Sequence, residues 1–121
     1  MRVQIVLFDG VEEQDFAGPY EVFSYAGRLS GGAAQVAFVS AAEPRVVTAA
    51  FGTRVAVAQG WSPAEADVIV VPGGGFGRPD GPGIWAEINA GSCRTNWRPQ
   101  RGPVCSSPHC APARSCSQRP G

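Results

Sequence analysis

The chain contains no lysine, and none of its acidic residues follows Glu87. Long apolar runs are also missing. The longest one near the amino terminus, Ile5 to Phe8 behind Val3, is far too short to cross a bilayer. Three carboxylates follow that run within a few residues, which is not the pattern of a secretory signal. These absences predict a protein with no membrane partner that is located in the cytoplasm.

The end of the chain lacks the side chains that build a core. From Ser92 to Gly121 there is no Leu, Ile, Phe, Met or Tyr, so this segment cannot bury enough apolar surface to offset the entropy lost on ordering it. The segment has five arginines and no acid, whereas the preceding part has five arginines against ten acids. The 121 residues therefore predict one small domain, residues 1–90, followed by an aberrant and disordered tail, residues 91–121.

The first ninety residues carry the patterns of a parallel α/β sheet. Val3 to Phe8 is a near-continuous apolar run, as expected for a strand buried on both faces. Similar patterns predict the remaining elements in chain order: a helix over 12–26, a strand over 33–40, a hairpin from 46–48 and 54–57, a helix start at 62–65, a strand over 67–71 and a helix over 84–90. This is the order of an open α/β fold.

Several residues of the first predicted helix carry specific expectations. Pro19 predicts a kink, or a helix that begins at that residue, and Gly27 is expected to end the helix. Glu12 and Glu13 are expected to be exposed carboxylates in the first turn, where the helix dipole favours them. Three large aromatic side chains are predicted to pack in the core: Tyr20, Phe23 and Trp85.

Two turns lie where the carboxyl ends of the predicted strands meet, which is where ligands bind in open α/β sheets. The first turn leads to Asp15, and the second is Pro72-Gly73-Gly74-Gly75. On the residues alone, Asp15 is either a site carboxylate or a helix cap on a solvated face. The glycines are either backbone donors to a ligand or only a tight exit from a strand.

Two motifs resemble the DJ-1/PfpI superfamily of class I glutamine amidotransferase-like domains. They are Val3-Gln-Ile-Val-Leu-Phe-Asp-Gly-Val-Glu-Glu-Gln-Asp15-Phe-Ala-Gly-Pro-Tyr-Glu-Val-Phe23 and Asp67-Val-Ile-Val-Val-Pro-Gly-Gly-Gly75. Within the first, Asp15-Phe-Ala-Gly-Pro-Tyr-Glu-Val is most similar to isonitrile hydratases and to sensor-like domains fused to AraC-type regulators. The resemblance covers residues 3–90.

The resemblance implies a flavodoxin-like fold, an open and mainly parallel sheet with helices on both faces, here truncated, and usually a homodimer. It also implies a cysteine nucleophile with Asp15 beside the thiol and with the amides of Gly73 and Gly74, in the turn to Gly75, facing the same site. A carboxyl beside a thiol shares its proton, and backbone N–H groups stabilise developing negative charge. In an isonitrile hydratase, Asp15 would move protons while water adds to R–NC and gives an N-substituted formamide.

The cysteine turn that the family requires, followed by an apolar helix, is absent from this sequence. A shifted reading frame accounts for it. When each codon's third base is joined to the first two bases of the next codon, residues 104–121 can read L-L-V-A-S-L-C-T-G-A-V-L-L-A-A-A-G. The leucines from the Asn96/Trp97 and His109/Cys110 junctions are forced by the genetic code. We interpret the tail as frameshifted, and the chain as an inactive form of an intact parent.

Other interpretations of the tail fit less well. A metal site built from Cys105, Cys110, Cys116 and His109 has no CxxC pair, and a disulfide framework that includes Cys93 conflicts with the cytoplasm. A basic arm for nucleic acid has no helix that fits a groove. No cofactor is predicted either, because the glycines after the predicted strand over 67–71 lack the spacing of a dinucleotide or phosphate fingerprint.

Three functions remain open for the parent protein. They are an isonitrile hydratase-like lyase, the ligand-sensing domain of an AraC-type transcriptional regulator, and a redox-protective or chaperone-like protein. In each case the partner is a small-molecule substrate or ligand, and nucleic acid enters only through a downstream regulator domain. Nothing in residues 1–90 distinguishes one substrate from another.

Overall fold

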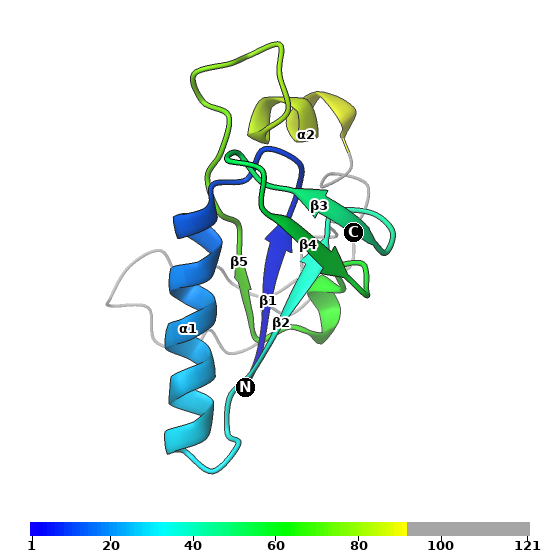
Figure 1. Ribbon diagram of the computed structural model, residues 1–121. Helices are drawn as coiled ribbons and strands as arrows, with labels where there is room; N and C mark the ends of the chain where they lie inside the picture. The colour runs from blue at the N-terminus through cyan, green and yellow to red at the C-terminus, as the bar shows by residue number, and fades with distance from the viewer. Residues whose placement is uncertain (92–121) are drawn as a thin grey trace, which may run out of the picture.

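A parallel sheet of three strands forms the centre of the protein. In the computed structural model, which describes residues 1–91, β1 (Arg2–Leu7) lies between β2 (Gln35–Ser40) and β5 (Val68–Val70), as Figure 1 shows. Ile5 of the central strand pairs with a residue of each neighbour. The sheet confirms the predicted α/β class and its parallel strands. The tail predicted for 91–121 lies outside the described residues, apart from its first position.

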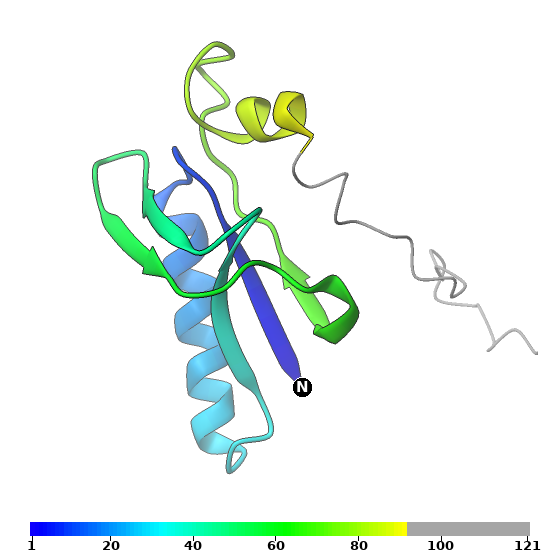
Figure 2. The same cartoon turned by 90° about the vertical axis from the view of Figure 1, so that its right-hand side faces the viewer.

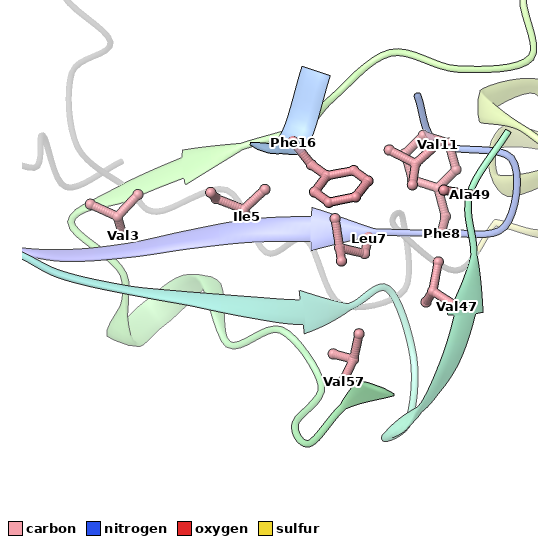
Figure 3. Close-up of a cluster of buried hydrophobic side chains, with 9 residues drawn as sticks. All are labelled: Val3, Ile5, Leu7, Phe8, Val11, Phe16, Val47, Ala49 and Val57. Atoms are coloured by element: carbon pink, nitrogen blue, oxygen red, sulfur yellow. The ribbon is translucent and has the colours of Figure 1, made fainter. Parts of the chain in front are cut away.

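One face of the sheet packs against α1 (Glu13–Leu29). Side chains alternate along β1, so Val3, Ile5 and Leu7 point to this face and are buried. Phe16 of the helix joins them, as Figure 3 shows, and its ring meets that of Phe38 edge-on at 5.6 Å. The helix is thus held by apolar contacts from its first turns.

Of the two alternatives predicted at Pro19, a kink or a helix start, the helix start is wrong. The helix begins six residues earlier, at Glu13, and continues past Pro19 without interruption. Gly27 does not end it either, since the last helical residue is Leu29. The helix is capped by Ser30, whose hydroxyl donates a hydrogen bond to the carbonyl of Ala26 at 2.7 Å. The core contacts of Phe16 and Phe23, on either side of Pro19, offset the hydrogen bond that a proline removes.

The opposite face of the sheet has its own apolar cluster. Val6 and Val39 are buried there with Trp61, which belongs to the loop after the hairpin. The side chain of Gln4 exchanges two hydrogen bonds with the backbone of Ser62, at 2.9 and 3.2 Å. Within residues 1–91 this loop, and not a helix, packs on the second face (Figure 2).

The predicted hairpin is confirmed as β3 (Arg45–Thr48) and β4 (Arg54–Val57), an antiparallel pair. Val47 and Val57 point inward and extend the main core beyond the end of β1 (Figure 3). Gly52, with φ of +95°, forms the turn. The hairpin therefore stands beside the carboxyl end of the sheet.

Two further helical segments follow. The helix start predicted at 62–65 yields only a single 3-10 turn, Pro63–Glu65, because the amide of Asp67 already pairs with the carbonyl of Arg2 and begins the next strand. The predicted helix over 84–90 is confirmed as α2 (Ile84–Ala90), which lies beyond the carboxyl ends of the strands (Figures 1 and 2). It ends at Gly91 in the left-handed conformation.

Of the three aromatic residues predicted in the core, one is placed there. Phe23 packs against the main cluster. Tyr20 stacks on Phe38 at 4.5 Å but keeps 40% of its surface exposed, and Trp85 is 41% exposed. Trp85 is outside the core because α2 is short, and Ile84 is its residue that packs against the main cluster.

Candidate functional site

The turn after β1 is fixed by Asp9 and Gly10. The carboxylate of Asp9 accepts a hydrogen bond from the amide of Thr48 at 2.9 Å and pairs with the guanidinium of Arg45. The amide of Gly10 donates to the carbonyl of Thr48 at 2.9 Å. Gly10 has φ of +82°, a conformation that favours glycine. The turn is therefore locked to the hairpin, and the chain leaves it in the direction of α1.

The glycine-rich loop after β5 packs backbone against backbone on that turn. A Cβ atom on Gly74 would lie 2.3 Å from the carbonyl oxygen of Gly10, and one on Gly83 would lie 2.6 Å from the Cα of Gly75. The amide of Ile84 donates to the carbonyl of Gly74 at 3.0 Å. Gly74 and Gly75 are thus required for close packing, whatever else they do.

The structure brings together two of the predicted site residues, Asp15 and Gly73. The amide of Gly73 donates to Oδ2 of Asp15 at 3.2 Å, and a Cβ atom on Gly73 would lie 2.7 Å from the same oxygen. Gly73 therefore leaves the space that the carboxylate occupies. Within residues 1–91, the N–H groups of Gly74 and Gly75 have no hydrogen-bond acceptor. Their predicted role as donors to a substrate stays a prediction, as does the catalytic role of Asp15.

Glu13 is a structural residue that the sequence analysis placed wrongly in solvent. Its Oε1 accepts hydrogen bonds from the amides of Phe51 at 3.0 Å and Thr53 at 3.3 Å. Partial burial raises the pKa of this carboxyl, but the hydrogen bonds from its own amide and from Phe51 and Thr53 outweigh it and lower the pKa below 4.5. Glu13 fastens the hairpin turn to the start of α1. Glu12, as expected, is exposed.

A hollow of about 620 Å³ opens between these segments. Its walls are the β1–α1 turn, the tip of the hairpin and the loop that follows the three glycines, and it lies beyond the carboxyl end of the sheet, where open α/β folds bind ligands. A volume of this size suits a small organic molecule. The charged residues on its walls are Asp9, Glu12 and Arg78.

Two exposed aromatic side chains stand on the walls of the hollow. Phe51, at the tip of the hairpin, is 85% exposed, and Phe76, beyond the glycines, is 67% exposed. The ring of Phe76 also reaches Gly73, since a Cβ atom there would lie 3.4 Å from its Cε2. Phe76 thus connects the hollow with the Asp15–Gly73 pair. The sequence analysis missed both residues, although each follows or precedes a glycine in a predicted turn.

These features define a flavodoxin-like α/β domain with an acidic residue of the first helix bound to a glycine-rich loop at the strand ends. The chain belongs to the DJ-1/PfpI family, whose pattern matches residues 1–80.

A solved structure supports the same fold. The chain is similar to the crystal structure of an AraC family transcriptional regulator from Pseudomonas putida, with a TM-score of 0.53 and 20% sequence identity over 78% of this chain. The match covers 60% of the regulator's chain, so the present chain spans less than two thirds of it. None of the curated proteins matches the sequence.

Metal sites and membrane spans were part of the sequence predictions. Among residues 1–91, no cluster of His, Cys, Asp and Glu has the grouping needed to hold a metal ion. The same residues include no helix that is both long and apolar enough to cross a bilayer. The four cysteines all lie outside this range, so the metal and disulfide interpretations of the tail concern residues that the structure does not describe.

Proposed function

We propose that residues 1–91 supply the small-molecule site of a ligand-sensing DJ-1/PfpI domain, of the kind that serves an AraC-type transcriptional regulator. The observation that carries this is the open hollow beside the Asp15–Gly73 pair, in a stretch of sequence that contains no cysteine. Binding needs only a shaped cavity with a few polar groups, whereas covalent catalysis needs a nucleophile. The similarity in fold to an AraC family regulator supports the same choice.

Nuclear magnetic resonance of the ¹⁵N-labelled 121-residue chain tests this proposal. The titrants are a set of neutral, anionic, cationic and zwitterionic small molecules, each added to about 1 mM, where even weak ligands bind measurably. We expect at least one of them to shift the amide signals of Phe51, Gly75 and Phe76 while leaving Arg28, at the far end of α1, unchanged. If no compound in any class shifts the hollow's signals, the proposal is wrong.

A second candidate is an isonitrile hydratase-like lyase in the intact parent, as the sequence motifs suggested. The favouring observation is that the Asp15 carboxylate stands at the strand ends, held by the Gly73 amide, where a nucleophile brought by a later strand would meet it. The reaction adds one water to R–NC and yields R–NH–CHO, with Asp15 passing the protons. In this candidate the 121-residue chain itself is inert, because its sequence lacks the cysteine turn.

The two candidates differ in what the restored reading frame would encode. Repeated sequencing around the codons of Ala90 to Ser92 should reveal a slipped base, and the corrected downstream sequence should contain either a stop after one domain or a pair of helix-turn-helix patterns. The first outcome favours the lyase and the second the regulator. An intact frame in every read would disprove the frameshift. Formamide formation by the purified 121-residue chain at an ordinary enzymatic rate would disprove its inactivity.

A further inference from the structure

Among the charged residues that line the hollow, one cation and one anion form no ion pair with any other group of residues 1–91. Asp9 is committed, because it accepts the Thr48 amide and pairs with Arg45. Glu12 and Arg78, by contrast, form no salt bridge within residues 1–91. Both line the hollow and both are exposed. A ligand with charges of both signs would therefore satisfy two groups that the fold leaves unpaired.

The backbones that carry these two charges are held firmly. The amide of Glu12 donates to the carbonyl of Gly73 at 3.0 Å. The amide of Arg78 donates to the carbonyl of Gly75, and the carbonyl of Arg78 accepts from the amide of Gly81, each at 3.0 Å. The backbone of each residue is thus anchored to the same glycine-rich loop, Glu12 through Gly73 and Arg78 through Gly75. A fixed backbone lowers the entropy that a ligand must remove when it binds.

Each charge has a suitable partner among common functional groups. The planar guanidinium of Arg78 matches a carboxylate, which it can bind through two parallel hydrogen bonds. The carboxylate of Glu12 accepts hydrogen bonds from an ammonium group. A single small molecule that presents both groups is an amino acid.

The exposed aromatic rings indicate the remaining part of the ligand. Phe51 is 85% exposed and Phe76 is 67% exposed, and both line the hollow. The backbone of Phe51 is held in place, because its amide donates a hydrogen bond to the Glu13 carboxylate. Burying an apolar side chain between such rings removes apolar surface of both partners from water. The ligand should therefore carry an apolar or aromatic side chain.

We propose that the hollow binds a zwitterionic amino acid with an apolar side chain. Its carboxylate lies on Arg78, its ammonium on Glu12, and its side chain against Phe51 and Phe76. This rests on the proposed function, because it names the ligand class of the same hollow. It goes further, because it states which charged groups the ligand carries and which residue binds each of them.

Three matched probes test the assignment on the 121-residue chain: L-phenylalanine, 3-phenylpropionate, which lacks the ammonium, and phenethylamine, which lacks the carboxylate. Binding is followed by the amide signals of Phe51, Gly75 and Phe76. We expect L-phenylalanine to bind at least about tenfold more tightly than either analogue, a difference of about 1.4 kcal/mol. Equal binding of the three, or tighter binding of an analogue, would overturn the proposal.

Two substitutions add a crossed pattern. Arg78→Gln should weaken phenylalanine and phenylpropionate but not phenethylamine, and Glu12→Gln should weaken phenylalanine and phenethylamine but not phenylpropionate. The controls Arg54→Gln and Glu65→Gln remove exposed charges that do not line the hollow, and should change nothing. A substitution that weakens all three probes equally contradicts the assignment. Should a variant fail to fold, the three probes on the unaltered chain still decide.

The failure of this proposal is separable from that of the proposed function. If other small molecules shift the hollow's signals but the three probes do not, the amino-acid assignment is wrong and the ligand-binding role stands. If nothing shifts them, both are wrong.

Discussion

Gly73 and Asp15, 58 positions apart, share one hydrogen bond and one small space. The amide of Gly73 donates to Oδ2 of Asp15 at 3.2 Å, and that oxygen occupies the place where a side chain on Gly73 would begin. The two residues therefore depend on each other, and the first helix is joined through them to the loop after the third strand of the sheet. Such mutual dependence can be measured.

Gly73→Ala should displace the Asp15 carboxylate and destabilise the protein by about 1 kcal/mol, the size of one hydrogen bond to a charged group at a solvated position. In an Asp15→Ala background the same change should cost less, because the oxygen is already gone, and the coupling should reach about 0.5 kcal/mol. Urea unfolding of the four variants measures it. Gly77→Ala is the control, since a Cβ atom there meets nothing within 4 Å.

Replacing each of two glycines of α1 with alanine should change the stability of the protein in opposite directions. A Cβ atom on Gly27 would lie 2.4 Å from the carbonyl oxygen of Ala34, so Gly27→Ala should destabilise the protein by about 1–3 kcal/mol. Gly18 has nothing within 4 Å, so Gly18→Ala should stabilise it by about 0.5–1 kcal/mol through better helix propensity. The two midpoints of urea unfolding make the comparison. Equal effects of the two substitutions would contradict the packing at Gly27.

The pH dependence of stability should contain a contribution from Glu13. Hydrogen bonds to its carboxylate lower its pKa below 4.5 in the folded protein, so its contribution is complete above pH 4.5 and is lost as the pH falls through the lowered folded value. Unfolding midpoints measured between pH 3 and 7 should therefore fall less steeply in acid for Glu13→Gln than for the unaltered chain. Glu21→Gln, at an exposed position of the same helix, should leave the profile unchanged.

Hydrogen exchange gives a local readout of the same contact. At pH 7 the amides of Phe51 and Thr53 should lose protection in Glu13→Gln, because a neutral amide oxygen is a weaker acceptor than the carboxylate. The amides of β1 should keep theirs. Unchanged protection at Phe51 would show that the hairpin turn is held by something other than Glu13.

Asp9 contacts the hairpin through a hydrogen bond and an ion pair, and two substitutions measure the two contributions separately. Arg45→Gln should cost at most about 0.5 kcal/mol, because exposed ion pairs contribute little. Asp9→Ala should cost about 1 kcal/mol or more, since it also leaves the amide of Thr48 without its acceptor. High salt should reduce the first effect more than the second. Urea unfolding at low and high salt checks both.

Much of the fold could be predicted from local patterns. The run from Val3 to Phe8 is apolar at every position except Gln4. It forms the central strand, which is buried on both faces. The hairpin followed from two short apolar runs around Gly52, and the last helix from a short amphipathic stretch. Local signals failed where tertiary packing overrides them, as at Pro19, which the core holds inside a continuous helix.

The candidate site could be predicted only in part. Asp15 and the glycines were found because a family resemblance marked them, and the structure then placed Asp15 on the amide of Gly73. The roles of Glu13 and of the two exposed phenylalanines could not be found in this way. Each depends on segments far apart in the sequence that no periodicity brings together: Glu13 and Thr53 are 40 positions apart, and the hollow is lined by residues from Asp9 to Pro82.

The sequence by itself determined the elements and their order, because apolar periodicity, glycine and proline act within a few residues of chain. It also determined family membership, since two motifs lie in the right order within residues 1–80, which the family pattern matches. Only the tertiary structure decided which carboxylates of this turn accept hydrogen bonds from other parts of residues 1–91 and which do not. Asp9 and Glu13 are bound by the hairpin, whereas Glu12, between them in sequence, faces the hollow. Neighbouring residues of one turn point in different directions, so their partners depend on the segments that fold around them.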